Sequence, residues 1–404
     1  MGDCGKKEPP ARSLGVALGL VALITPLAVH LFLPVIPAVK VALSLSDAQA
    51  QLAFSIALFT MSFATLVYGS LSDYWGRRPA LLSGLLLFLL GSTVSVLAQT
   101  AATLALGRVV QAMGAGCAMT LVRAIARDVY RAEHLVRAIA YLTMFYTLGP
   151  MIAPLVGGVL IDSFGWRSVF GLALASGGAI LVAAYAIIPE THPNAAAKGR
   201  EAALLSGYLD LLRKPQFVGY VLQSGFSTGA FITLASASAT LMTELLHRPG
   251  SEFGLYFLLF PVGFFFGNLV SSRISSRASN EVMVLAGSLL ALGTVIVQTL
   301  LFLAGHITPA TFFFPGFFLT FSQGIALPYA QVGSMAVIPR LAGTAAGIGV
   351  FMQNFAGAAF AQIYGIIADG TPMPMVVVIA CAAVLCLVAG LVPFLVRMAS
   401  RGWA

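Results

Sequence analysis

Twelve runs of mostly apolar residues, each long enough to cross a lipid bilayer, follow one another along the 404-residue chain. A membrane-spanning helix needs about 20 such residues at 1.5 Å each. The runs cover approximately residues 14–38, 47–70, 80–98, 101–126, 136–161, 168–188, 215–241, 253–272, 281–303, 308–334, 342–366 and 373–397. Because no run alternates apolar and polar residues, a β-barrel is not indicated. The pattern predicts an all-α membrane protein with twelve transmembrane helices.

The composition excludes the two main alternatives to a membrane protein. Hydrophobic residues make up 59% of the chain and charged residues only 9%, whereas a soluble domain is about 25% charged. Disorder requires low hydrophobicity, so it is excluded as well. The net charge of +8 does not indicate nucleic-acid binding, because the basic residues stand singly between apolar runs rather than in a cluster.

A polar stretch at the midpoint divides the chain into two sets of six runs. It extends from Pro189 to Lys214 and is the longest polar segment in the sequence. We therefore expect an N-terminal six-helix bundle over residues 1–190, a cytoplasmic linker over 191–214 and a C-terminal six-helix bundle over 215–404.

Basic residues are distributed unevenly between the two sides of the predicted membrane. With the N-terminus in the cytoplasm, 18 of the 22 Lys and Arg residues fall in the cytoplasmic connections or termini. Three lie on the other side, namely Lys40, Arg167 and Arg248, and Arg108 falls within the fourth run. The positive-inside rule therefore places both termini in the cytoplasm. A bacterial inner membrane is the expected location of this multi-pass chain.

The connection between the second and third runs carries a dense motif. Gly69, Asp73, Gly76, Arg77 and Arg78 stand within eleven residues, from position 69 to Pro79. The string resembles the G-x-L-a-D-r-x-G-R-[RK] signature of the major facilitator superfamily, whose members have twelve helices in two halves. The resemblance implies a cytoplasmic gate latch in which Arg77 pairs with an acid that ends helix four, here Asp128. The second-half copy at 267–273 lacks the acid, so its latch should be weaker.

Two further motifs are similar to those of this family. Arg108 and Gln111 match R-x-x-Q-G-x-G-A, although the glycine is displaced, and the resemblance implies an arginine that faces the central cavity and takes part in proton transfer. Snorkelling of Arg108 to the surface is the alternative. Helix five holds the pattern typical of drug:proton antiporters in the family, formed by Gly149, Pro150, Pro154, Gly157 and Gly158.

Three shorter segments narrow the resemblance. Residues 26–37, 253–257 and 342–345 are similar to those of the Bcr/CflA drug-efflux group, which includes bicyclomycin and phenicol exporters. Members of that group commonly carry Asp where this chain has His30. None of the 14 acidic residues falls at a predicted bilayer midplane. His30, which titrates near neutral pH, is therefore a candidate proton carrier, and a histidine that only bonds between helices is the open alternative.

The expected cavity is neutral to positive, because it holds Arg108 and no acid. Neutral, zwitterionic or anionic substrates should fit it better than cations. The remaining candidates for its wall are polar or aromatic side chains on the inner helices, where an amide is equally suited to packing between helices. They are Phe32, Tyr146, Gln223, Gln323, Gln353 and Asn354.

The predicted function is export of small organic molecules or drugs, driven by the proton-motive force through alternating access. A major facilitator carrier for a metabolite or an organic anion is the alternative, and a membrane-embedded enzyme or a channel is a third possibility of another class. We expect no enzymatic activity, cofactor or metal, and no ATPase motor, since no P-loop motif is present. The expected partners are a small-molecule substrate, protons and the lipid bilayer, without nucleic acid, and we expect a monomer.

Overall fold

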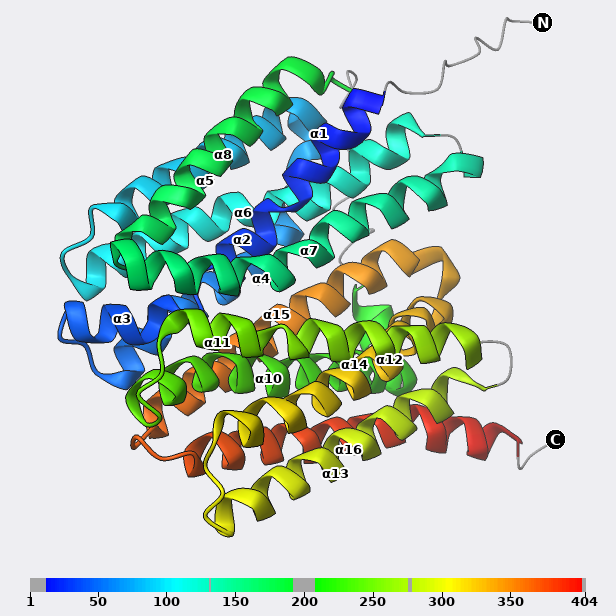
Figure 1. Cartoon of the computed structure of the whole chain (residues 1–404). Helices are drawn as coiled ribbons and strands as arrows, with labels where there is room; N and C mark the ends of the chain where they lie inside the picture. The colour runs from blue at the N-terminus through cyan, green and yellow to red at the C-terminus, as the bar shows by residue number, and fades with distance from the viewer. Residues whose placement is uncertain (1–11, 131, 192–207, 275–277, 402–404) are drawn as a thin grey trace, which may run out of the picture.

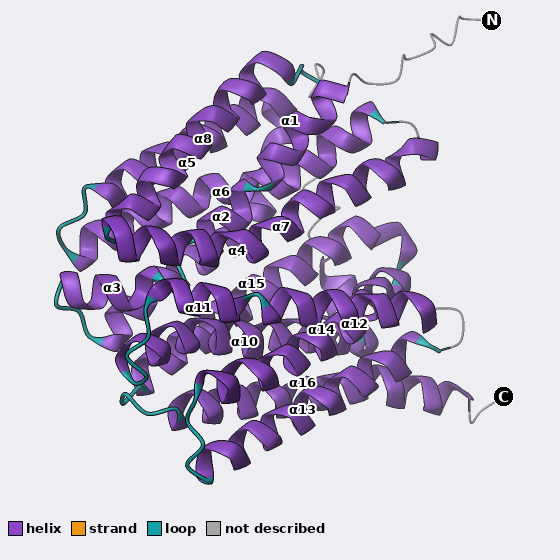
Figure 2. Cartoon of the chain, in the orientation of Figure 1, coloured by secondary structure: helices purple, strands orange, loops and turns teal. Residues whose placement is uncertain are grey.

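The computed structural model describes residues 12–130, 132–191, 208–274 and 278–401. Within these ranges the chain is built from helices joined by short loops and contains no strand (Figure 2). Twelve segments of the described chain are long and apolar enough to cross a membrane. The predicted all-α architecture with twelve spanning helices is therefore confirmed.

The N-terminal half is the part of the described chain up to residue 191. Its helices are α1 (Arg12–Ala22), α2 (Ile24–His30), α3 (Val35–Ala42), α4 (Asp47–Trp75), α5 (Arg77–Val96), α6 (Ala101–Val129), α7 (Ala132–Phe164) and α8 (Arg167–Ile187).

The C-terminal half is the part from residue 208 onward. Its helices are α10 (Pro215–Glu244), α11 (Gly250–Phe257), α12 (Leu259–Ile274), α13 (Asn280–Leu303), α14 (Pro309–Val337), α15 (Ala342–Ile367) and α16 (Met373–Arg401), with a short 3-10 turn at Pro339–Leu341. Most of the predicted linker 191–214 falls outside the described residues, so this domain division stays a prediction.

Side-chain caps determine where three of the long helices begin. Ser46, Thr100 and Thr308 each accept a hydrogen bond from the backbone N–H three residues on, and the side chain at that position bonds back to the backbone of the cap. Such capping boxes satisfy backbone groups that a helix start leaves unpaired. They explain why the second, fourth and tenth spans begin within one residue of their predicted starts.

Prolines divide two of the spans into shorter helices, which the apolar runs did not predict. The first span is interrupted at residues 31–34, where Val35 N–H bonds to the carbonyl of Phe32 at 2.9 Å instead of continuing the α-helical ladder. Pro34 and Pro37 have no N–H to donate. The eighth span changes from α11 to α12 at Leu258, three residues before Pro261.

The two halves lie side by side and separate toward one end. Figure 1 shows helices α1–α8 above and α10–α16 below, with both chain termini at the right. We call the end where α1 begins and α16 finishes the terminal end, and the other the opposite end. Contacts between α4 and α15 follow this divergence. A Cβ on Gly365 would lie 2.4 Å from Gln51, whereas one on Gly347, nearer the terminal end, would lie 4.0 Å from Leu66.

Candidate functional site

The hydrogen bonds between the halves gather at the opposite end. Ser55 on α4 donates to Oε1 of Gln362 on α15 at 2.6 Å, and Gln362 Nε2 donates to the Ala48 carbonyl at 3.2 Å. Further along the same helix pair, Phe59 meets Phe355 and Phe63 meets Phe351 edge to face, each at 5.3 Å between ring centroids. The halves are thus joined at the opposite end and along part of α4 and α15.

The glycines of the helix-five motif bring α7 close to two other helices. A Cβ on Gly149 would lie 2.3 Å from Pro26, and one on Gly157 would lie 3.0 Å from the carbonyl oxygen of Leu31. Gly158 lies against the other half, where a Cβ would come within 2.1 Å of the Gly250 carbonyl oxygen. The motif therefore supplies part of the surface that joins the halves, and Pro150 and Pro154 lie within the same helix.

A carboxylate reinforces this contact. Asp162, two residues before the end of α7, accepts hydrogen bonds from the backbone N–H groups of Gly250 and Ser251 at 3.0 and 2.8 Å. These are unpaired donors at the positive end of α11, where an acid is electrostatically favourable. The motif search did not single out Asp162, because its partners are backbone groups of a distant segment.

The residues of the predicted gate latch form a cluster within the N-terminal half. Arg77 at the start of α5 bonds to Asp73 at 2.6 Å and, through Nε, to Asp128 at 3.1 Å. It also donates to Ser72 Oγ. Gly69 has open space around it. The two ion pairs join α5 to α4 and α5 to α6 within one half, so the cluster braces that half. Its role as a gate stays a prediction.

Glu190 completes this cluster and was missed by the sequence analysis. Its carboxylate accepts hydrogen bonds from the backbone N–H groups of Arg77 and Arg78 at 3.0 and 3.1 Å, which caps α5. The preceding Gly76 has φ = +98°, a conformation that L side chains rarely adopt. A Cβ there would also lie 2.6 Å from Glu190 Oε2. Arg78 Nη2 donates a hydrogen bond to the carbonyl of Tyr185 on α8 at 2.7 Å.

A counterpart with reversed charges lies in the C-terminal half. Glu281 at the start of α13 forms an ion pair with Arg397 near the end of α16, and it accepts a hydrogen bond from Tyr220 at 3.1 Å. In the N-terminal half the basic residues Arg77 and Arg78 start α5, and the acid Glu190 follows the end of α8. The second-half motif lacks its acid, as the sequence analysis noted, and the ion pair of Glu281 with Arg397 joins α13 to α16.

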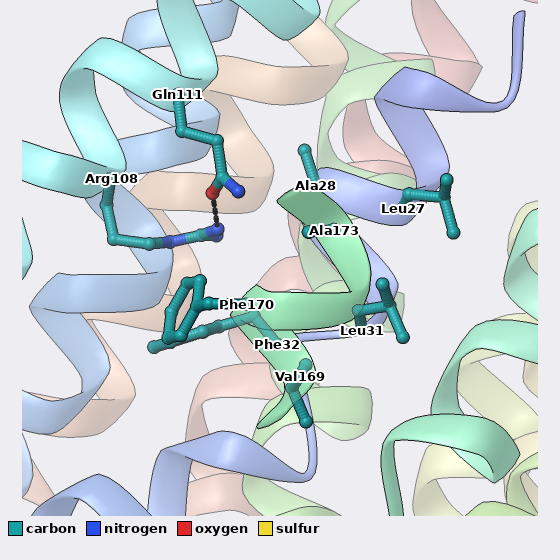
Figure 3. Close-up of a pocket in the computed structure, with 9 residues that line it drawn as sticks. All are labelled: Leu27, Ala28, Leu31, Phe32, Arg108, Gln111, Val169, Phe170 and Ala173. Carbon is teal, nitrogen blue, oxygen red and sulfur yellow. Dashed lines mark hydrogen bonds between the residues drawn. The ribbon is translucent and has the colours of Figure 1, made fainter. Parts of the chain in front are cut away.

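Arg108 is enclosed within the N-terminal half. Only 1% of its surface is exposed, although the resemblance implied that it faces the central cavity. Its Nε donates to the Ala53 carbonyl at 3.1 Å, its Nη1 to Gln111 Oε1, and its guanidinium lies 4.3 Å from the centre of the Phe32 ring. Figure 3 shows Arg108, Gln111 and Phe32, with Phe170 beside Phe32. Phe32 and Gln111 are equally buried, so three predicted cavity residues form one interior cluster.

The pocket beside Arg108 is small and mainly apolar. Helices α2, α6 and α8 line it, together with the turn after α2, and its only polar side chains are Arg108 and Gln111 (Figure 3). It leaves roughly 10 Å³ for the centre of a water molecule, about what a single water requires. Arg108 Nη2 has no hydrogen-bond partner within the described part of the chain. A drug-sized ligand needs a pocket of at least about 300 Å³, so this pocket in its present form is too small for one.

His30 ends α2 and is buried at the boundary between the halves. It is 8% exposed, its Nδ1 has no hydrogen-bond partner, and its ring lies 6.3 Å from that of Phe257 on α11 of the other half. No hydrogen bond or ion pair joins it to an acid among the described residues. A titratable side chain therefore lies where the halves meet.

The other predicted cavity residues occupy different environments. Gln223 packs inside the C-terminal half, bonded to Ser288 at 3.2 Å and to Cys386. Gln323 is 7% exposed and donates to Thr228 on α10 at 3.3 Å. Tyr146, Gln353 and Asn354 are half-buried, and Gln353 Nε2 has no hydrogen-bond partner. In this structure, Gln353 therefore offers an unused amide donor and Gln223 is already engaged inside its half.

The interior of the described spanning segments carries positive but no negative side chains. Every acidic residue in the described spans lies within three residues of a span end. Arg108 and Arg123 lie deeper, and Arg123 is exposed and within electrostatic range of Tyr146 on α7. The sequence analysis counted Arg123 with the cytoplasmic connection, but α6 continues to Val129. The interior of the described spans thus has two cations and no carboxylate.

Three sequence comparisons with known proteins point to the same family. The model of the Major Facilitator Superfamily matches residues 18–361. Multidrug resistance protein D of Escherichia coli is 29% identical over 366 residues, which cover 87% of this chain and 89% of that protein. A bicyclomycin resistance protein homologue of Haemophilus influenzae is 24% identical over 269 residues, covering 66% of this chain and 68% of that protein.

The same fold occurs among solved structures. A bacterial homologue of the human lysosomal transporter Spinster, in an inward-facing and unoccupied conformation, superposes with a TM-score of 0.78. The match covers 94% of this chain and 97% of that chain at 18% sequence identity. At this identity the likeness concerns the fold alone.

Proposed function

Because this chain belongs to the Major Facilitator Superfamily, whose relatives here are multidrug efflux transporters, we propose that it exports small organic molecules in exchange for protons. It is a multi-pass protein of the bacterial inner membrane and a transporter rather than an enzyme, as predicted. The resemblance to the Bcr/CflA group is confirmed by the bicyclomycin resistance homologue. The proposal goes beyond the family in two respects, which are the coupling of export to proton flow and the charge of the transported molecules.

The observation that carries the proposal is the one-sided closure of the two halves. Hydrogen bonds and close glycine contacts join the halves at the opposite end, whereas α4 and α15 diverge toward the terminal end. The excess of Lys and Arg at the terminal end supports a cytoplasmic location for it. The structure then corresponds to an inward-open state, and export requires the halves to rock until the opposite end opens.

His30 supports the proton-coupled part of the proposal. Its imidazole is buried beside Phe257 of the other half, and its Nδ1 has no hydrogen-bond partner among the described residues. A proton taken up at His30 from the outside and released to the cytoplasm would link inward proton flow to the return of the empty carrier. Histidine is the side chain whose unperturbed pKa lies nearest physiological pH.

The charge balance of the spans supports neutral, zwitterionic or anionic cargo. A cationic drug would meet Arg123 near Tyr146 and no carboxylate deeper than three residues from a span end. The same observation favours the second candidate, a carrier for an organic anion or another metabolite. The two functions differ in their cargo and share the mechanism of alternating access.

Drug accumulation in intact cells tests the export proposal. We expect a host that lacks its main efflux pumps to accumulate less phenicol or bicyclomycin when it expresses this protein. An uncoupler that collapses the proton-motive force should abolish the difference. Equal accumulation with and without the protein, at verified expression, would contradict drug export and leave the metabolite carrier.

A further inference from the structure

Lys40 forms an ion-pair cluster that crosses the boundary between the halves. Its Nζ lies 2.6 Å from Oδ1 of Asp47 and 2.8 Å from Oε2 of Glu244. Lys40 and Asp47 belong to α3 and α4 of the N-terminal half, and Glu244 is the last residue of α10. The three side chains are 22–31% exposed, so water and external ions reach them at the opposite end.

Helix electrostatics make Glu244 dependent on Lys40. A helix carries partial negative charge at its C-terminus, where an acid is unfavourable and a cation is favourable. Lys40 and Asp47 have the favourable signs at the end of α3 and the start of α4, but Glu244 has the unfavourable sign at the end of α10. Lys40 is the cation that compensates it.

Separation of the halves would therefore break the ion pair between Lys40 and Glu244 and leave the ion pair between Lys40 and Asp47 intact. Lys40 keeps Asp47, which lies in the same half, while Glu244 loses its cation. Tyr364 on α15 lies within electrostatic range of both Glu244 and Asp369, and after separation these two acids stay together in the C-terminal half while Lys40 and Asp47 leave. The penalty falls only on the open state.

We propose that the Lys40–Glu244 ion pair, with Asp47 holding Lys40 in position, is a clamp that keeps the opposite end closed and sets how often it opens. The inference rests on the proposed alternating access. It adds an outer clamp to the cluster of Asp73, Arg77 and Asp128, whose ion pairs lie within one half. Asp162 acts on the other flank, through the backbone of Gly250 and Ser251.

Access of a reagent to a buried cysteine measures this opening directly. Ser55 is 0% exposed and faces Gln362 of the other half, so a Ser55→Cys side chain is shielded in the closed state. In a background without the native cysteines, a membrane-impermeant maleimide is added to intact cells. We expect Glu244→Gln to raise the alkylation rate roughly fivefold, the factor that corresponds to one partly exposed ion pair.

The chain offers a matched control and a rescue. Glu252 pairs with Arg248 at 3.7 Å at the same end, but both belong to the C-terminal half, so Glu252→Gln should leave the alkylation rate unchanged. Lys40→Glu should open the protein further, and the exchange Lys40→Glu with Glu244→Lys should restore slow alkylation. If Glu244→Gln does not fold, Lys40→Met replaces it in the test, because it removes the same ion pair.

Unchanged alkylation in Glu244→Gln and Lys40→Met, or no rescue by the charge exchange, would overturn the clamp. The readout is reagent access and does not depend on the cargo or on proton coupling. If the alkylation rates differ as expected but the protein does not export drugs, the result would count against the proposed function and not against the clamp.

Discussion

The ring of His30 lies 6.3 Å from the ring of Phe257, and the two residues belong to different halves of the molecule. His30 is at the end of α2, directly before the proline-interrupted turn at residues 31–34. Movement of one half against the other must change this contact. The imidazole is thus placed where its protonation and the rocking of the halves can influence each other.

Replacement of His30 by glutamine keeps a polar side chain and removes the titratable group. We expect His30→Gln to bind drug with an affinity within about threefold of the wild type but to lose drug-induced proton movement, because the described part of the chain has no other buried imidazole at this boundary. Drug binding to purified protein and proton release on binding are the two measurements. Full proton release in a folded His30→Gln protein would remove His30 from the proton path.

Arg77 should matter for stability as well as for transport. Arg77→Gln breaks two ion pairs of a side chain that is 12% exposed, and we expect a loss of about 1–3 kcal/mol in the free energy of unfolding. Thermal unfolding in detergent measures the loss. Arg340→Gln is the control, since Arg340 is 76% exposed and its pair with Asp210 spans 3.5 Å; it should change stability by about 0–1 kcal/mol. Equal effects of the two changes would contradict this interpretation.

Gly158→Ala should hold the halves apart at the opposite end. The added methyl group would lie 2.1 Å from the Gly250 carbonyl oxygen, and backbone cannot give way as a flexible side chain can. We expect at least a tenfold loss of transport, normal folding, and faster labelling of cysteines at the opposite end. Gly171→Ala on α8, with no neighbour within 4 Å, should transport normally. Normal transport by Gly158→Ala would show that this contact does not limit closure.

The geometry of Arg108 should matter beyond its charge. Arg108→Lys keeps the cation but loses the fork that bonds both the Ala53 carbonyl and Gln111, so we expect transport to fall about tenfold. Arg167 is a matched control: it also bonds backbone carbonyls, of Val96 and Ala98, and lies 4.2 Å from the Trp166 ring centre, but at the opposite end. Arg167→Lys should transport within about twofold of the wild type. Equal losses in both variants would refute a special role for Arg108.

The clamp should tolerate alkaline conditions. Burial alone would lower the pKa of Lys40, but its hydrogen bonds and charge interactions with Asp47 and Glu244 outweigh burial and raise it above its usual value of 10.5. A raised pKa means that the contribution of Lys40 is complete below 10.5 and is lost only as pH rises through the higher value of the folded protein. Alkylation of Ser55→Cys, corrected for the reactivity of a free thiol, should therefore stay constant between pH 7.5 and about 9.5. A rise within that range would contradict the account.

Much of the fold follows from the sequence because the bilayer leaves few alternatives. Twenty apolar residues in a membrane must be helical to satisfy their backbone, so run length alone placed the twelve spans. The breaks near Pro34 and Pro261 were missed because apolar content says nothing about which backbone bonds a proline removes.

The candidate site was less accessible to sequence reasoning. Asp73 and Arg77 stand four residues apart, and the motif itself suggested their contact. Lys40 and Glu244 are 204 positions apart, and each reads as an ordinary loop or helix-end charge. One available signal was that Lys40 is a cation on the side where cations are rare. The burial of Arg108 and Gln223 inside their halves could not be predicted, because the direction a helix faces depends on tertiary packing.

Proton movement in energised everted vesicles tests drug:proton antiport most directly. Respiration acidifies the lumen, and an antiporter that carries drug inward must release lumenal protons. We expect addition of a phenicol or bicyclomycin to collapse the pH gradient in vesicles that contain the wild-type protein, and His30→Ala vesicles with equal protein to show no collapse. A collapse caused only by organic anions would contradict drug export coupled to protons. The absence of any collapse, whichever compound is added, would contradict it as well.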